Sequence, residues 1–474
     1  MITDKSLKLF HRVASEIPAY RNFLKENNIE PNEIDNLEKF RLVPTISKKG
    51  YLQKNNRHDL IWPQYLKSPL WYSATSGSTG EPYYFPRTDE IAERGSRFAE
   101  EFIENSSYGD GSTLVIIGFG MGIWIGGIIT LRSFEIASTR INKPISFLPT
   151  GYNKNEIFKA LKKLAPDFQQ TILIGYPPFI KEVVDEAADK GIKFEELNIR
   201  LIFAAESFSE SFRDYLCAKI GIENPILDTL NIYGTADLGA IAYETPLSIL
   251  VRRIAIKKPE LFEELFGQIQ KTPTLAQYHS DLLEIEESDG ELLITSDGAI
   301  PLVRYAIGDN GGVFDYSFIE SKFAKYGIDI EKEAKNNGLY NFKKSMPFVY
   351  VYERTDLSTS LHGILIYPEY IKAGIDNLKI SEYLSGKFNM QTRYDENENQ
   401  YLEVNLELKK AKESSEELEN NAYASILENL KLKSSEFSEI TKTQIPEKLV
   451  KIKILPNGEE QYFAQGVKQK WVNK

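Results

Sequence analysis

Four short apolar runs alternate with helix-like segments through the middle of the chain. The runs cover residues 114–117, 171–174, 201–204 and 230–233, and glycine, proline or other small residues follow each one. Amphipathic segments at residues 179–190 and 210–220 follow the second and third runs. This alternation predicts a mostly parallel sheet covered by helices on both faces. Ligands of such sheets bind beyond the carboxyl ends of the strands, so we expect the site in the loops after these runs.

The two ends of the chain follow other patterns. The first seventy residues are expected to be helical and loop-like, with an apolar helical face that ends before Pro18 and consists of Leu7, Phe10, Val13, Ala14 and Ile17. After Asp309, a polar and helix-prone segment (316–344) leads to an expected strand at 348–352. A small unit is expected to begin near Arg354. It contains strands at 363–367 and 450–455, a hairpin around 394–400 and a charged helix at 414–432.

The predicted fold class is therefore α/β. A large N-terminal domain with mostly parallel sheets spans residues 1–353, including a helical lead-in at residues 1–70. A small α+β C-terminal domain spans residues 354–474. A length of 474 residues is too great for one ordinary core, which agrees with this division.

One uncharged stretch, residues 112–131, is long enough to cross a bilayer, because about 20 apolar residues suffice. Its glycines, at Gly118, Gly120 and Gly122, divide it into a short strand-like run and a later apolar run. That division is typical of a buried strand, a tight turn and the start of a buried helix. We therefore expect no membrane span.

Composition narrows the class of protein further. The chain is 42% hydrophobic and 26% charged, as in globular proteins with a large core. Its net charge of −11 argues against binding along a nucleic acid, which needs a basic surface. The single cysteine, Cys217, excludes an internal disulfide, and the four histidines lack the spacing of metal ligands. Without a signal-peptide core at the N-terminus, the expected location is cytoplasmic.

The segment at residues 75–82 has the composition of a phosphate-binding loop. It consists of Thr75, Ser76, Gly77, Ser78, Thr79, Gly80, Glu81 and Pro82. Glycines let backbone N–H groups converge, and the hydroxyls add donors without bulk or charge, as the terminal oxygens of a polyphosphate require. It is not a Walker loop, because no lysine follows the last glycine at the required spacing. A flexible serine–glycine linker is the alternative interpretation.

Two later segments add charged groups near strand ends. Residues 232–237 place Asp237 just past a strand and a glycine turn, and residues 301–309 contain Arg304 and Asp309. A carboxylate can accept hydrogen bonds from both hydroxyls of a ribose, and arginine can pair with phosphate. The glycine cluster at 118–122, in contrast, is not a dinucleotide fingerprint, because Ile123 stands where the third glycine belongs.

In this order the segments resemble the adenylate-forming superfamily, in particular its phenylacetate–CoA ligase-like branch. Residues 17–21 and 42–48 look like the N-terminal signature of that branch, and residues 175–178 and 205–206 look like segments ahead of its acyl pocket and near its adenine. Motifs similar to its Tyr-Gly-x-Thr-Glu, Arg-Tyr-x-x-Gly-Asp, Gly-Arg-x-Asp and C-terminal lysine segments stand at residues 233–237, 304–309, 354–356 and 467–472. The sequence departs from these motifs at Ala236, Asp237, Glu353 and Trp471.

The resemblance implies a role for each matched residue. ATP would be bound by the loop residues Thr75 to Gly80 and by Glu206, Tyr233, Gly234, Thr235, Asp309 and Arg354. Asp237 would hold Mg²⁺ and act in catalysis with Arg304 and Lys468, with Lys470 as the alternative lysine. Asp356 would be the hinge of a mobile C-terminal domain. Apart from the resemblance, Tyr176, Phe203 and Trp124 are candidates for lining an apolar acyl pocket, although aromatic residues at strand ends more often belong to the core.

The implied reaction has two steps. ATP first activates a carboxylic acid, aromatic or otherwise small, to an acyl-adenylate with release of pyrophosphate, and the acyl group then passes to a thiol, with coenzyme A as the expected acceptor. A carrier-protein thiol as acceptor, an adenylyltransferase and a nucleotide-binding relative without turnover are the alternatives. The expected partners are thus the acid, ATP, Mg²⁺ and coenzyme A or a carrier protein. No nucleic acid is expected as a partner and no membrane span is expected, and a homodimer is left open.

Overall fold

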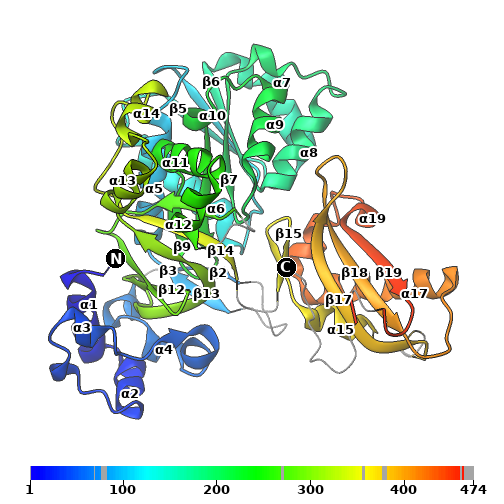
Figure 1. Ribbon diagram of the computed structural model, residues 1–474, viewed down its shortest axis with the longest axis horizontal. Coiled ribbons are helices and arrows are strands. Elements are labelled where there is room, and N and C mark those ends of the chain that lie inside the picture. Colours follow the sequence, from blue (N-terminus) through cyan, green and yellow to red (C-terminus); the bar gives the residue numbers. More distant parts are fainter. Residues whose placement is uncertain are drawn as a thin grey trace.

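The computed structural model describes residues 2–68, 70–75, 83–267, 272–354, 358–375, 380, 382–459 and 462–463. A twelve-stranded mixed sheet forms the centre of the large N-terminal part of the chain, and a three-stranded sheet forms the C-terminal part. Figure 1 shows the C-terminal part, in orange and red, beside the larger part, with β15 (Thr359–Leu361) between them. The candidate site lies where these two parts meet.

One half of the large sheet is parallel, as the sequence predicts. Its strands pair in the order β5-β4-β6-β7-β8. They are β4 (Thr113–Ile117), β5 (Ile145–Pro149), β6 (Gln170–Gly175), β7 (Ile199–Ala204) and β8 (Thr229–Thr235). Buried on both faces, such strands are continuous apolar runs, which is why these runs are visible in the sequence.

Two layers of helices cover this parallel half. Leu114 and Ile116 of β4 pack in one apolar cluster with α7 (Lys154–Lys163), α8 (Pro177–Ala187) and α9 (Glu210–Ile220). Val115 and Ile117 pack in another, with α5 (Glu90–Glu104) and α6 (Ile125–Ser138). Alternate residues of a strand point to opposite faces, so each strand serves both layers.

The other half of the sheet is antiparallel, so the expectation of a mostly parallel sheet is only partly correct. The chain reverses after β8 in a tight hairpin with β9, where a parallel crossover would need a dozen or more residues. The strands are β9 (Gly239–Tyr243), β10 (Thr274–Gln277), β11 (Leu283–Ser288), β12 (Glu291–Ser296), β13 (Leu302–Phe314) and β14 (Phe348–Arg354). The helices that accompany them are α10 (Pro225–Asp228), α11 (Pro246–Ile256), α12 (Pro259–Phe266), α13 (Tyr316–Lys325) and α14 (Ile330–Asn336).

The N-terminal lead-in is helical and packs against the antiparallel half. It contains α1 (Asp4–Glu16), α2 (Pro18–Glu26), α3 (Leu37–Phe40) and α4 (Arg57–Leu60). The first helix ends before Pro18, which then begins α2 as its first residue, a position where the missing N–H of proline costs nothing. Within the lead-in, the short strand β1 (Ile46–Ser47) pairs in parallel with β13. After the lead-in, β2 (Trp71–Ala74) pairs with β3 (Tyr84–Arg87).

The uncharged stretch at residues 112–131 is a buried strand followed by a turn and a helix, β4 and α6. None of the helices that the structure describes is long and apolar enough to cross a membrane. The glycines of the stretch therefore separate a buried strand from a helix, as the division of the sequence predicts.

The C-terminal part has an apolar cluster of its own, formed by buried residues between Leu361 and Val450. Its strands are β15, β16 (Ile364–Ile366), β17 (Leu384–Tyr394), β18 (Gln400–Leu408) and β19 (Val450–Leu455). Its helices are α15 (Pro368–Ile375), α17 (Glu416–Lys433), α18 (Ser435–Ile440) and α19 (Pro446–Leu449). The predicted hairpin around residues 394–400 is the turn between β17 and β18, and we refer to residues 358–463 as the C-terminal unit.

Candidate active site

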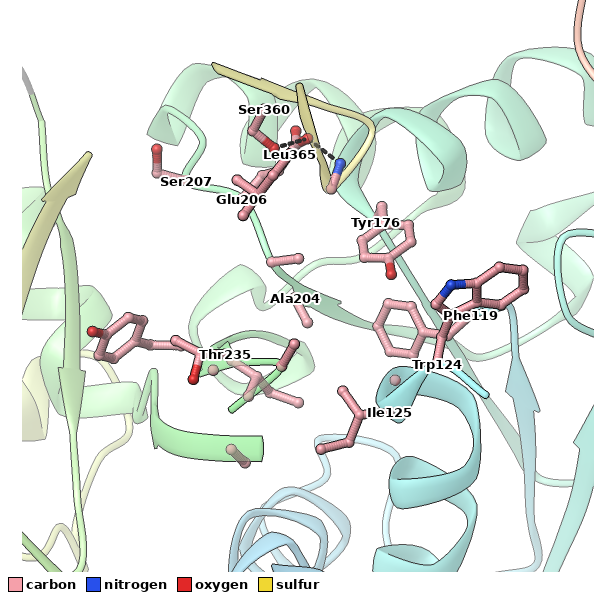
Figure 2. Close-up of a pocket in the computed structure, with 18 of the residues that line it drawn as sticks. Phe119, Trp124, Ile125, Tyr176, Ala204, Glu206, Ser207, Thr235, Ser360 and Leu365 are labelled. Atoms are coloured by element: carbon pink, nitrogen blue, oxygen red, sulfur yellow. Dashed lines mark hydrogen bonds between the residues drawn. The ribbon is translucent and has the colours of Figure 1, made fainter. Parts of the chain in front are cut away.

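A cavity of about 450 Å³ lies at the carboxyl ends of the parallel strands, where the sequence predicts the site. Phe119, Tyr176, Glu206 and Asp237, which follow β4, β6, β7 and β8, line it from the large part of the chain, and the C-terminal unit lines the other side. Figure 2 shows Phe119, Trp124 and Tyr176 gathered on one side of the cavity, Thr235 on the opposite side, and Glu206 beside Ser360.

Asp237 stands in a polar group on the cavity wall. Its carboxylate pairs with the ammonium of Lys48 at 2.7 Å and accepts a hydrogen bond from the hydroxyl of Tyr305 at 2.5 Å. The side chain of Asp237 is only 11% exposed, against 29% for Lys48. The sequence identifies Asp237 but assigns no role to Lys48 or Tyr305. Both lie in segments that carry the family resemblance, which is the signal that could have found them.

Distant segments hold this group together. Ile46 on β1 pairs with Tyr305 on β13, so the lysine two residues later reaches the end of β8. The buried guanidinium of Arg87 donates hydrogen bonds to the backbone carbonyls of Ala236 and Asp237, the latter at 2.6 Å. Burial lowers the pKa of Arg87 to about 9. Arg87 therefore fixes the backbone that carries the Asp237 carboxylate.

Asp309 and Tyr233 form a second polar group of the cavity. The hydroxyl of Tyr233 donates to the Asp309 carboxylate at 2.6 Å, although the two residues lie 76 positions apart. Gly234 next to Tyr233 cannot carry a side chain, because a Cβ there would lie 2.7 Å from the carbonyl oxygen of Gly239. Thr75, Tyr233, Gly234, Thr235 and Asp309 all line the same cavity, so the structure brings together residues from three predicted segments.

Arg304 points away from the cavity, in contrast to the expectation that it meets phosphate. Its guanidinium pairs with Glu286 at 2.7 Å and donates to the carbonyl of Val43, and it is buried. Successive side chains of a strand point to opposite faces, so Tyr305 faces Asp237 while Arg304 faces the lead-in. The structure therefore gives Arg304 a structural partner in place of a ligand.

The Glu206 carboxylate contacts the C-terminal unit. One oxygen accepts hydrogen bonds from the Ser360 hydroxyl at 2.9 Å and from the backbone N–H of Gly363, and the other accepts from the Gln400 amide at 2.9 Å. His362 and Gly363 form the two-residue turn between β15 and β16, with φ of 50° and 78°. A Cβ on Gly363 would lie 2.6 Å from the ring of Tyr176, so the turn fits closely against the large part of the chain.

The backbone of the loop after β7 is strained next to Glu206. Ala205 has a φ of 72°, in the left-handed region that residues with a Cβ rarely adopt. Such strain persists where the surrounding structure holds it, and it gathers at functional sites. The amide of Asn231 donates to the carbonyl of Glu206 at 3.0 Å and supports this conformation.

One end of the cavity is lined by aromatic and aliphatic side chains. Phe119 packs against Tyr176 with 4.9 Å between ring centroids, and Trp124, Ile125 and Ile129 also line the cavity. The sequence therefore predicts Tyr176 and Trp124 correctly as lining residues. Phe203 is different, because it is buried in the cluster with Phe208 and Phe212 on the helix-covered face of β7.

Several predicted residues lie outside the described part of the chain. They are the loop residues Ser76, Gly77, Ser78, Thr79 and Gly80, the hinge candidate Asp356, and the lysines Lys468 and Lys470. Arg354 is described as the last residue of β14, with its Cα opposite Asp309, but not in its side chain. Among the residues that the structure describes, there is no group of three or more histidine, cysteine, aspartate or glutamate side chains that could hold a metal ion.

Comparisons with known proteins find distantly related sequences and similar folds. No protein-family model matches the sequence. Phenylacetate–coenzyme A ligase of Pseudomonas putida is 24% identical over 62% of this chain, and that of Thermus thermophilus is 21% identical over 50%. The matched regions span 61% and 49% of the lengths of these relatives.

Solved structures match over nearly the whole chain. A 2-hydroxyisobutyryl-CoA ligase in complex with 2-HIB-AMP and CoA, in the thioesterification state, is similar over 99% of this chain and 89% of that chain, with a TM-score of 0.64 and 15% identity. The same ligase in a postadenylation state matches the same shares with a TM-score of 0.54 and 14% identity.

The chain has the fold of this ligase, and its sequence is distantly related to the phenylacetate–CoA ligases, as the resemblance of its motifs to the adenylate-forming superfamily predicts.

Proposed function

We propose that the protein activates a carboxylic acid with ATP to an acyl-adenylate and then transfers the acyl group to coenzyme A. The observation that carries the proposal is the convergence of Thr75, Asp237 and Asp309 on one cavity of about 450 Å³. These three residues come from the three segments in which the resemblance implies phosphate, metal and ribose binding. Relationship to phenylacetate–CoA ligases supports the choice of acid and acceptor.

Each polar group of the cavity has a part in the proposed first step. Asp309, aligned by Tyr233, accepts hydrogen bonds from the ribose hydroxyls. Lys48 can turn its ammonium from Asp237 to a phosphate oxygen, because its side chain is partly exposed on the cavity wall. The substrate carboxylate then attacks the α-phosphorus, and pyrophosphate leaves. No general base is needed, since the acid is already ionised, so the residues contribute position and charge.

Mg²⁺ fits this proposal at Asp237. Proteins commonly hold Mg²⁺ by one or two carboxylates together with phosphate oxygens and waters, and Asp237 offers one such carboxylate on the cavity wall. When bound, the ion would neutralise charge on the phosphates during transfer. Tyr305 and Arg87 keep the Asp237 carboxylate in place through its side chain and its backbone.

The acyl group would occupy the apolar end of the cavity. Phe119, Trp124, Ile125 and Ile129 offer an apolar surface that suits an aromatic or a small branched acid. Ser133, which also lines this end, already donates its hydroxyl to the carbonyl of Ile129 at 2.7 Å. The lining therefore favours an acid whose tail is apolar.

Exchange of label between pyrophosphate and ATP tests the proposal directly. The full-length protein is incubated with Mg²⁺, ATP and labelled pyrophosphate, together with aromatic, short aliphatic or fatty acids in turn. Exchange that depends on one class of acid is the expected result, and release of AMP on addition of coenzyme A would complete the reaction. Binding of ATP without exchange for any acid would reject acid activation.

A further inference from the structure

The cavity is lined by four carboxyl groups, and three of them already have partners. Asp237, Asp309 and Glu206 accept hydrogen bonds from the groups described above. The fourth, Glu436, lies near the start of α18 in the C-terminal unit. Within the described part of the chain its carboxylate has neither an ion pair nor a hydrogen bond, and burial raises its pKa. Among the four carboxyl groups, that of Glu436 is therefore available to accept a hydrogen bond or a proton from a ligand.

The surroundings of Glu436 are aromatic. Tyr152 and Tyr176, from the loop before α7 and the start of α8, are the titratable groups that face it, and their rings stack with 6.0 Å between centroids. On its own helix, Glu439 pairs with Lys442 instead. Burial without a compensating charge raises the pKa of Glu436 to about 7.

The helix α18 lies beside both the cavity and a second hollow, which could admit the acceptor of the second step. This second hollow has a volume of about 530 Å³, and its lining includes Ser435, Ser438, Glu439, Lys431 and Lys442. Trp124 lines both this hollow and the cavity, so the two spaces adjoin at this residue. An acceptor bound in this hollow would therefore lie next to the cavity that Glu436 and Tyr176 line.

We propose that Glu436 is the proton acceptor for the thiol in the second step of the reaction, an inference that rests on the proposed function. The Glu436 carboxylate takes the proton of the S–H group, and the sulfur forms a bond to the carbonyl carbon of the acyl-adenylate. The bond between that carbon and the phosphate oxygen breaks, and AMP leaves with its electron pair. The products are the thioester, AMP and a protonated Glu436, which then returns its proton to water.

The environment of Glu436 makes this proton transfer more favourable. A thiol titrates near pH 8.5, about four units above an ordinary glutamate, so an ordinary carboxylate is a poor base for it. The raised pKa of Glu436, about 7 in place of 4.5, makes the transfer about 300-fold less unfavourable at equilibrium. The carboxylate form also still dominates at slightly alkaline pH, as a general base requires.

The test separates the two half-reactions in Glu436→Gln, which keeps the shape of the side chain. Acyl-adenylate is formed on the enzyme with a substrate acid, MgATP and pyrophosphatase, and is then mixed rapidly with coenzyme A between about pH 5.5 and pH 9. We expect thioester formation to fall by about 10²–10⁴-fold, the contribution typical of a general base, with pyrophosphate exchange unchanged. The wild-type rate should rise with pH through about 7, and this rise should be absent in the variant. Glu428→Gln, at an exposed position of α17 that lines neither the cavity nor the hollow, is the matched control.

Three results would overturn the inference. They are normal thioester formation by Glu436→Gln, an equal loss in both half-reactions, and a wild-type enzyme that forms the adenylate but no thioester with coenzyme A. A wild-type enzyme without acid-dependent exchange would reject the proposed function itself, and this inference with it. Thermal unfolding checks that the Glu436 carboxyl is buried. Because its pKa is higher in the folded than in the unfolded protein, ionisation of Glu436 lowers the stability of the folded protein as the pH rises toward 7. The variant should therefore gain melting temperature over wild type more at pH 8 than at pH 5.

Discussion

The contact between Glu206 and the C-terminal unit yields a prediction whose size follows from the hydrogen bonds. In Glu206→Gln, the amide oxygen can still accept from Ser360 and from the N–H of Gly363. The new NH₂ group, however, faces the NH₂ group of Gln400, where the carboxylate now accepts a bond of 2.9 Å. Gln400 cannot turn its amide to compensate, because its oxygen already accepts from the N–H of His362 at 2.5 Å.

The expected cost is about 3 kcal/mol. A hydrogen bond to a charged group contributes about 1.5–3 kcal/mol and a neutral one about 0.5–1.5 kcal/mol. The variant loses one charged bond and turns two others into neutral ones, and Glu206 is half-buried, so values toward the low end apply. Because 1.4 kcal/mol is tenfold, separation of the C-terminal unit should become about 10²-fold more frequent.

Hydrogen exchange measures this separation without any substrate. Amides of the β15–β16 hairpin should exchange faster in Glu206→Gln, while amides of β6 and β7 in the core keep their protection. Ser207→Ala is the control, since Ser207 lines the same cavity but makes no hydrogen bond to the C-terminal unit among the described residues. Unchanged protection of the hairpin in Glu206→Gln would refute the reasoning, and faster exchange throughout the chain would point to general unfolding instead.

Three further substitutions test the candidate site. Arg304→Met should lower the free energy of unfolding by about 3–5 kcal/mol, because Glu286 is left buried without its partner. Thermal unfolding and the pyrophosphate-exchange activity per folded molecule measure the effect. Lost activity at unchanged stability would contradict the structural role of Arg304. Tyr305→Phe should slow acid-dependent pyrophosphate exchange about tenfold by freeing the Asp237 carboxylate, and an unaltered dependence on MgATP concentration would count against it. Lys468→Ala should reduce adenylation about 10²–10³-fold, the effect of removing one charge-stabilising donor, whereas a full rate would favour Lys470 as the lysine.

The sequence alone predicts the elements whose pattern is local. The helix expected at residues 210–220 begins and ends at those residues in the structure, and the four apolar runs are all strands. Continuous apolar runs and helical faces are properties of neighbouring residues, so they are visible without knowledge of the fold. The carboxyl ends of these strands are likewise the place where the cavity forms.

The antiparallel half of the sheet is much less visible. β13 runs over thirteen residues but contains Arg304, Asp309 and several glycines, so its sequence resembles a turn as much as a strand. Its conformation depends on pairing with β12 and β14 and on the short parallel strand β1. Such pairing joins residues far apart in the chain, and a single sequence does not display it.

The roles of individual charged side chains depended on the tertiary structure. Arg304 and Tyr305 are neighbours in one motif, but Tyr305 faces Asp237 and Arg304 faces Glu286, because successive side chains of a strand point to opposite faces. Lys48 and Glu436 met the cavity only because β1 pairs with β13 and the C-terminal unit packs against Tyr176. The sequence determined which charges exist and which short elements form, because both are local properties. The fold decided which charges face one another and which are buried, because register and packing between distant segments set their surroundings.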